Sequence, residues 1–252
     1  MVRQQRKSKG AFWALLGAVA VLGLIAIAYV AAKPKTRGIT EVDLKADPTQ
    51  ARGYLLGDST APVQVIEFAD FECPACMQFA TLTEPDVRKL VEQGKISYRY
   101  FDFPLEMHRN TWEASNTAAC ADEQGKFWPM HDALFAAQDQ WNGEATRNPK
   151  PVLKGLAQQI GLDVAKWESC YDEQRYRSRI AANRAEGERR HIQSTPTFII
   201  GNKIIPGALD SDKFMSYVAE AAAAAGPRPA TPAMGPASGL PGAKKDTSGA
   251  RK

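Results

Sequence analysis

The chain has 252 residues, of which 44% are hydrophobic and 24% charged, so it can bury a core of ordinary size. Its formal net charge is only +4, and much of the basic excess lies near the two ends. Proteins that bind nucleic acids usually carry a basic stripe on their folded part. The composition therefore argues against a nucleic-acid partner.

An uncharged apolar run covers residues 11–32 and follows a basic segment at residues 1–10. As a helix, the run would be roughly 33 Å long, enough to cross a hydrocarbon core of about 30 Å. We expect a single transmembrane signal anchor, with the basic segment in the cytoplasm. The alternative is a cleaved signal peptide, for which Val30-Ala31-Ala32 offers a small-residue cleavage site.

A strand–helix–strand pattern follows a polar spacer at residues 33–51. Residues 62–69 are typical of a buried strand, apolar residues then recur at helical spacing, and residues 96–103 predict a second strand. This order favours a βαβ unit with parallel strands. Several short helices are expected between residues 111 and 188.

The last predicted elements are a hairpin and a helix. Residues 197–200 and 203–205 flank a Gly-Asn pair, which predicts a tight turn between two strands. A final helix is expected to begin at Asp210 or Ser211. Residues 226–252 are rich in Pro, Ala, Gly, Ser and Lys, a composition typical of a disordered tail.

The motif that carries chemistry is Cys73-Pro74-Ala75-Cys76, which stands between the first strand and the helix. Disulfide exchange needs a thiolate of low pKa and a second thiol within reach. At a helix start, Cys73 meets unpaired N–H groups and the positive end of the helix dipole, and Cys76 lies on the same face. The motif therefore indicates a redox-active pair.

Two other interpretations of the motif stay open. A zinc site needs further ligands, but Cys120 and Cys170 are isolated and the three histidines show no ligand spacing, so no metal site is expected. A purely structural disulfide is the other interpretation, although a strand-to-helix junction is where catalytic pairs are typically found.

Four stretches, in order along the chain, resemble the DsbA-like branch of the thioredoxin superfamily. They are residues 65–76 with the cysteine motif, residues 98–104, residues 120–135, and Ser194-Thr195-Pro196-Thr197-Phe198. The resemblance implies an α/β, thioredoxin-like fold over residues 52–225, with a helical insertion at about residues 106–189.

The resemblance also assigns roles around the cysteine motif. It implies that Pro196 is cis and packs beside Cys73, and that the backbone of Thr195 pairs with an extended substrate segment. Pro74 and Ala75 would belong to the same substrate-binding surface. Without the resemblance, an ordinary trans proline at the start of a strand would be the simpler interpretation.

Glu67 matches the buried acid that the family places beneath its redox pair. A carboxyl group in an apolar strand should have a raised pKa and could exchange a proton with Cys76. The alternative is a residue at the end of a strand that faces solvent.

Two features depart from the strongly oxidising members of the family, which carry His between the cysteines. This chain has Pro74-Ala75 there, and Glu72 adds a negative charge directly before Cys73. We hypothesise that the pKa of Cys73 is higher, and its oxidising power lower, than in those members.

Cys120 and Cys170 both fall in the expected helical insertion. A bridge between them would close a loop of about fifty residues, worth roughly 4 kcal/mol in the chain-entropy model. Two reduced core thiols are the alternative. An oxidising compartment favours the structural disulfide.

These features predict an extracytoplasmic thiol–disulfide oxidoreductase on the periplasmic side of a bacterial cytoplasmic membrane, which forms disulfide bonds in exported proteins. No dissociable cofactor is expected. The expected partners are exported substrates with thiols and, as the resemblance implies, a membrane redox partner. The alternatives are a disulfide reductase or isomerase fed by a membrane electron donor, and a non-catalytic binding module.

Overall fold

The computed structural model describes residues 51–226 and the isolated residues 17, 23, 40 and 41. The predicted cytoplasmic segment, the anchor apart from Gly17 and Gly23, and the tail beyond Gly226 lie outside the described residues. Within the part that is described, no helix is both long and apolar enough to cross a membrane.

A mixed sheet forms the centre of the described region, with strand order β1–β6–β5–β3–β4–β2. β3 and β4 run parallel, and the other neighbouring strands are antiparallel. The strands are β1 (Thr40–Glu41), β2 (Tyr54–Leu56), β3 (Val63–Ala69), β4 (Ile96–Asp102), β5 (Thr197–Ile200) and β6 (Lys203–Pro206).

The predicted βαβ unit is present, but its crossover contains two helices, α2 (Pro74–Leu82) and α3 (Glu84–Glu92). The chain breaks at Thr83 because Pro85, in the first turn of α3, has no N–H with which to continue a helix. β1 and β2 were not predicted, since two or three residues are too short to show a period. β1 lies in the predicted spacer and pairs with β6.

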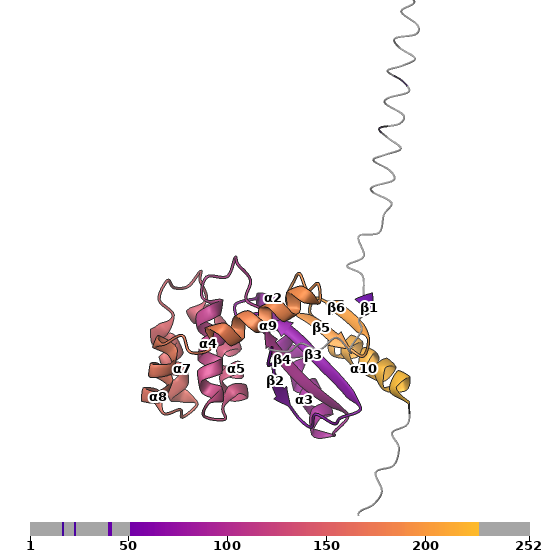
Figure 1. The fold of residues 1–252 in the computed structure, drawn as a ribbon, viewed down its shortest axis with the longest axis horizontal. Helices are drawn as coiled ribbons and strands as arrows, with labels where there is room; N and C mark the ends of the chain where they lie inside the picture. Colours follow the sequence, from indigo (N-terminus) through magenta and orange to yellow (C-terminus); the bar gives the residue numbers. More distant parts are fainter. Residues whose placement is uncertain (1–16, 18–22, 24–39, 42–50, 227–252) are drawn as a thin grey trace, which may run out of the picture.

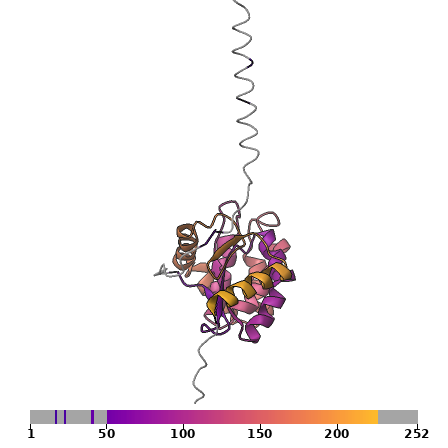
Figure 2. The same ribbon diagram turned by 90° about the vertical axis from the view of Figure 1, so that its right-hand side faces the viewer.

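Both faces of the sheet are covered, because successive side chains of a strand point to opposite sides. On one face, Val63 and Val65 pack with Phe79 of α2 and Phe214 of α10 (Ser211–Ala225). On the other face, Phe68 packs with Phe101 and Phe103, and α9 (Arg177–Arg189) contacts β4. Figure 2 shows α10 lying across the sheet.

The predicted short helices form an insertion between β4 and β5. They are α4 (Thr111–Asp122), α5 (Phe127–Ala136), α6 (Gln138–Trp141), α7 (Lys150–Gln159), α8 (Val164–Asp172) and α9. In Figure 1, α4, α5, α7 and α8 gather in a lobe beside the sheet. Their core holds two fully buried tryptophans, Trp141 and Trp167.

The hairpin and the last helix also match the sequence prediction. β5 and β6 are paired across Gly201 and Asn202, and Asp210 caps α10 by accepting a hydrogen bond from the backbone N–H of Lys213. The described residues therefore form an α/β, thioredoxin-like fold with a helical insertion.

Candidate functional site

Cys73 and Cys76 lie where β3 ends and α2 begins. Cys73 is the N-cap residue of α2, and its carbonyl oxygen accepts hydrogen bonds from the N–H groups of Cys76 and Met77, both at 3.1 Å. Both thiols are free; Cys73 keeps 7% of its surface exposed and Cys76 none. Only Cys73 is therefore open to a partner sulfur.

The pKa values of the two thiols are shifted in opposite directions. The pKa of Cys73 falls to about 6, chiefly because the side chain of Cys76 hydrogen-bonds to its sulfur, with smaller contributions from Thr195 and from N–H groups at the start of α2. Burial raises the pKa of Cys76 well above its ordinary value. At neutral pH, Cys73 is thus the thiolate and Cys76 the proton-bearing thiol.

Glu67 lies in the middle of β3 and is 2% exposed. Burial and then the charge of Glu84 raise its pKa to about 8, and the hydroxyl of Tyr98, which donates a hydrogen bond to the carboxyl group, opposes this rise. Glu67 also contributes to the raised pKa of Cys76, so the two groups interact electrostatically. An ionised Glu67 disfavours the Cys76 thiolate, so the protonation of one group is linked to that of the other.

The loop before β5 lies against the redox pair, because β5 is the neighbour of β3 in the sheet. The Thr195–Pro196 peptide bond is cis, and the carbonyl oxygen of Thr195 lies 3.5 Å from the sulfur of Cys73, which donates to it when the thiol is protonated. Pro74 is exposed and Ala75 half-buried, on the rim beside Cys73. The structure thus brings the Thr195–Pro196 loop against the cysteine motif.

Glu72 does not stand as a free charge beside Cys73. Its carboxylate accepts hydrogen bonds from the backbone N–H groups of Asn110 and Gly143, the former at 2.7 Å. These donors neutralise part of its charge and tie the start of α2 to the loops of the insertion. The expected unfavourable effect of Glu72 on the thiolate is therefore weakened by contacts that the sequence does not reveal.

His108 is a residue near the pair that we did not predict from the sequence. Its Nδ1 lies 2.8 Å from a carboxylate oxygen of the buried Asp70, whose backbone oxygen accepts a hydrogen bond from the N–H of Cys73. The bond to Asp70 is the main cause of a raised pKa of His108, and the charges of Glu72 and Cys73 add to it. Only the position of His108, five residues after the second predicted strand, pointed to this end of the sheet.

Cys120 of α4 and Cys170 of α8 form a disulfide in the structure, with their Cα atoms 5.8 Å apart. Both residues are fully buried in the core of the insertion. This second cysteine pair therefore lies in the insertion, apart from the redox pair at the start of α2.

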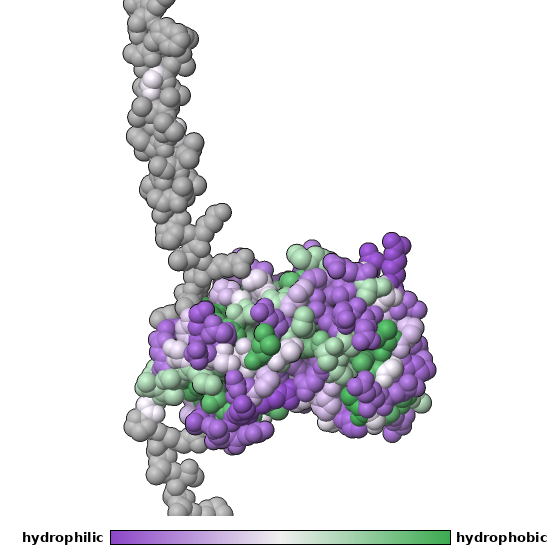
Figure 3. Space-filling view, turned by 180° about the vertical axis from the view of Figure 1, so that it is seen from behind, coloured by the Kyte–Doolittle hydropathy of each residue, from purple (hydrophilic) through white to green (hydrophobic). Residues whose placement is uncertain are grey.

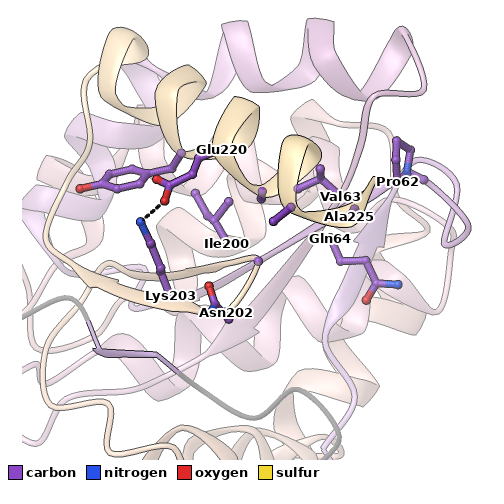
Figure 4. Close-up of a pocket in the computed structure, with 13 residues that line it drawn as sticks. Pro62, Val63, Gln64, Ile200, Asn202, Lys203, Glu220 and Ala225 are labelled. Carbon is purple, nitrogen blue, oxygen red and sulfur yellow. Dashed lines mark hydrogen bonds and ion pairs between the residues drawn. The ribbon is translucent and has the colours of Figure 1, made fainter. Parts of the chain in front are cut away.

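A cavity of about 610 Å³ lies at the opposite end of the sheet from the cysteines. It is bounded by α10, the start of β3 and the β5–β6 hairpin, and Lys203 and Glu220 form an ion pair at its edge (Figure 4). Because Val63 begins β3 and Cys73 follows its other end, this cavity is not part of the redox site.

Figure 3 shows one face of the molecule, where apolar residues form separate patches on a mainly hydrophilic surface.

Comparison with known proteins defines the class. A family model described as thioredoxin matches residues 49–220, and the chain belongs to this family. Among solved structures, it resembles alpha-DsbA1 of Wolbachia pipientis (TM-score 0.62, 21% identity, 73% of this chain and 94% of that one). It also resembles oxidised BdbD of Bacillus subtilis (TM-score 0.61, 21% identity, 73% and 97% covered).

Curated relatives fall into two groups. "Disulfide bond formation protein D" of Bacillus subtilis is 25% identical over 176 residues, which are 65% of this chain and 74% of the relative. "Na(+)/H(+) antiporter NhaA 3" of Salinispora tropica is 33% identical over 196 residues, but the match is 77% of this chain and only 28% of that protein. Most of the antiporter relative lies outside the match. The dithiol, the family and the first relative together support a thiol–disulfide oxidoreductase.

Proposed function

We propose that this protein is a membrane-anchored, extracytoplasmic thiol–disulfide oxidoreductase that forms disulfide bonds in exported proteins. The observation that carries the proposal is the pairing of an accessible, low-pKa Cys73 with a buried, high-pKa Cys76. Such a pair accepts attack at one sulfur only and keeps the other for resolving the mixed disulfide.

The reaction begins when a substrate thiolate attacks Cys73 of the oxidised pair. A bond forms between the substrate sulfur and Cys73, the Cys73–Cys76 bond breaks, and Cys76 leaves as a thiolate that takes a proton from Glu67. A second substrate thiolate then attacks the substrate sulfur of the mixed disulfide and releases Cys73 as a thiolate, which its pKa of about 6 makes a good leaving group. The loop with the cis Thr195–Pro196 bond lies where an extended substrate would pair.

The location is part of the proposal. The basic residues 1–10 and the apolar residues 11–32 have the pattern of a signal anchor. The Cys120–Cys170 bridge supports an oxidising compartment, because stable disulfides are rare in the cytoplasm. On the periplasmic side of the membrane, the reduced pair would be reoxidised by a membrane redox partner, and exported proteins with thiols would be the substrates.

A reductase or isomerase is the second candidate, and the pKa of Cys73 is the observation that favours it. A value of about 6 lies nearer to the value of about 7 in thioredoxin, a reductant, than to the value of about 3.5 in DsbA, a strong oxidant. Equilibration with glutathione decides between the two. A potential near −120 mV supports the oxidase, one near −180 mV the isomerase, and one near −270 mV the reductase.

The activity is tested by oxidative refolding of a reduced, disulfide-containing substrate with the oxidised protein. We expect Cys73→Ser to abolish catalysis and a Cys120→Ala/Cys170→Ala double variant to retain it, assayed at a temperature where both are folded. If Cys73→Ala or Cys73→Ser left the biological function intact, the protein would be a binding module instead.

A further inference from the structure

A buried polar cluster lies between α3 and α5. Glu84 and His131 are each 1% exposed. Oε2 of Glu84 and Nε2 of His131 lie 3.5 Å apart, and within the described residues neither atom has a hydrogen-bond partner. Buried polar atoms without partners are rare in folded proteins and ask for an explanation.

The inner end of the cluster reaches Glu67 through Tyr98. The hydroxyl of Tyr98, fully buried on β4, donates a hydrogen bond to the carboxyl group of Glu67. No other hydrogen bond involves the side chain of Glu67 among the described residues. Glu84 interacts electrostatically with both Glu67 and Tyr98, which places these three groups in one region of the core.

The outer end of the cluster reaches solvent. Nδ1 of His131 lies 2.9 Å from Oδ1 of Asp132, whose side chain is 54% exposed. Arg88 binds Oε1 of Glu84 at 2.7 Å and Oδ1 of Asp132 at 2.6 Å. Groups that can carry protons thus lie between the acid beneath the cysteines and the surface, although no hydrogen bond joins Tyr98 to Glu84 among the described residues.

The same side chains could be taken for a metal site, since Glu84, His131 and Asp132 each offer a ligand atom within 4.8 Å of the others. The guanidinium of Arg88 already binds both carboxylates and supplies the positive charge that they require. A divalent cation would have to displace it. A proton on Glu84 or His131, in contrast, leaves the contacts of Arg88 in place.

The redox cycle of the proposed function creates the need for such a route. Each time the Cys73–Cys76 bond forms, Cys76 must lose its proton, and each time the bond breaks it must gain one. Glu67 can exchange that proton, but it is 2% exposed and cannot exchange it directly with water. A buried acid that gains and loses a proton at every turnover needs other groups to carry that proton to solvent.

We propose that Tyr98, Glu84, His131 and Asp132 form the path by which the proton exchanged at Glu67 reaches solvent. The inference rests on the proposed function. A phenol passes a proton by accepting one while donating its own, and an imidazole takes a proton at one ring nitrogen and releases it from the other. The facing atoms of Glu84 and His131 need close by only a few tenths of an ångström to make a hydrogen bond.

The groups that face the path come from four elements. Glu67 is on β3, Tyr98 and Tyr100 are on β4, Glu84 and Arg88 are on α3, and His131 and Asp132 are on α5. The ring of Tyr100 meets that of His131 edge to face at 5.3 Å, and its hydroxyl has no partner within the described residues. Phe127, Phe135 and Trp128 also contact the ring of His131 and keep water from its sides.

The test is single-turnover ring closure. The full chain is loaded with glutathione as a mixed disulfide at Cys73. Attack by Cys76 then forms the Cys73–Cys76 bond and releases glutathione thiolate, and the released glutathione is measured between pH 6 and 9. We expect His131→Gln and Glu84→Gln to slow closure at least about tenfold at pH 7, with a larger solvent deuterium isotope effect.

Two comparisons separate the relay from a structural role. The equilibrium potential of His131→Gln should equal that of the wild type, because a relay changes a rate and not an equilibrium. Glu123→Gln is the matched control, since Glu123 pairs with Arg175 at 2.8 Å much as Glu84 pairs with Arg88, but lies in the insertion. We expect it to close at the wild-type rate.

Asp132→Asn decides the question if the buried variants do not fold, because Asp132 is largely exposed. We expect the same slowing, smaller in size. Wild-type closure rates and isotope effects in folded His131→Gln or in Asp132→Asn would overturn the relay. If the wild-type chain could not exchange disulfides at all, the proposed function itself would fail.

Discussion

At the scale of single residues, the site contains groups whose pKa values are shifted in opposite directions. The pKa of Cys73 is lowered to about 6, while burial raises those of Cys76 and Glu67. Pairs of groups with opposed shifts mark the donor and the acceptor in many active sites. Here they separate the nucleophilic sulfur from the groups that hold the proton.

His108→Asn tests whether this histidine stabilises the Cys73 thiolate. Because the charge of Cys73 raises the pKa of His108, the imidazolium must in turn favour the thiolate. We expect the variant to raise the pKa of Cys73 and to slow its alkylation at pH 6 by roughly twofold, since the imidazole is partly exposed. His191→Asn is the control, because His191 is exposed and its φ of 59° suits asparagine. Equal alkylation rates for both variants would contradict the role.

Glu67→Gln tests the buried acid through stability. The folded pKa of Glu67 is raised from 4.5 to about 8, so between these pH values the folded state holds a proton that the unfolded state has lost. The free energy of unfolding of the wild type should therefore fall as pH rises through this range. We expect Glu67→Gln to match the wild type near pH 4.5 and to exceed it above pH 8, by at most about 5 kcal/mol. Urea unfolding of both reduced proteins at pH 4.5 and pH 9 measures the difference, and parallel pH profiles would rule out the raised pKa.

At the scale of elements, the contact of α9 with the sheet depends on a glycine. A Cβ atom on Gly187 would lie 2.6 Å from the ring of Phe103 and 3.0 Å from that of Phe68. The helix can approach these rings only because position 187 has no side chain. This packing joins the end of the insertion to the face of β3 that is turned away from Glu67.

Gly187→Ala should therefore lower the free energy of unfolding by about 1–3 kcal/mol, because the packing between α9 and these rings leaves no room for a methyl group. Gly155→Ala is the control. Gly155 lies exposed within α7, no atom lies within 4 Å of its added Cβ, and alanine there should raise stability by about 0.5–1 kcal/mol. Urea titrations of the two variants should shift in opposite directions. A shift in the same direction would show that α9 can move aside.

At the scale of the whole molecule, two lobes meet at the redox pair. The sheet supplies Glu67 and the loop with Pro196, while the insertion supports the start of α2 through Gln138, whose side chain donates to the carbonyl oxygens of Phe71 and Cys73. The disulfide within the insertion ties α4 to α8. The pair is thus held from both sides.

Fractionation tests the proposed anchor. We expect the full-length chain, expressed in bacteria, to sediment with membranes and to resist extraction by high salt and carbonate, because residues 11–32 are long enough to span the bilayer. A chain that begins at residue 33 is the control and should stay in the supernatant. A shortened product released from the full-length chain would indicate a cleaved signal peptide instead.

Much of the fold could be predicted from the sequence because it depends on local patterns. The strands β3 and β4, the β5–β6 hairpin and the cap at Asp210 follow from hydrophobic period and turn chemistry. The break at Thr83 and the short strands β1 and β2 could not be predicted, because hydrophobic periodicity does not reveal them. The break at Thr83 comes from a proline inside an otherwise helical pattern, and β2 is only three residues long.

For the site, the sequence alone determined the cysteine motif at a strand-to-helix junction, and its resemblance to a family pointed to Glu67 and Pro196. Only the tertiary structure decided which side chains surround them. Asp70 binds His108 across 38 residues, and Glu72 reaches Gly143 across 71. Such contacts join segments far apart in the chain, and the pKa of a thiol or a carboxyl group depends on the charges and donors that folding brings to it. No local pattern records them.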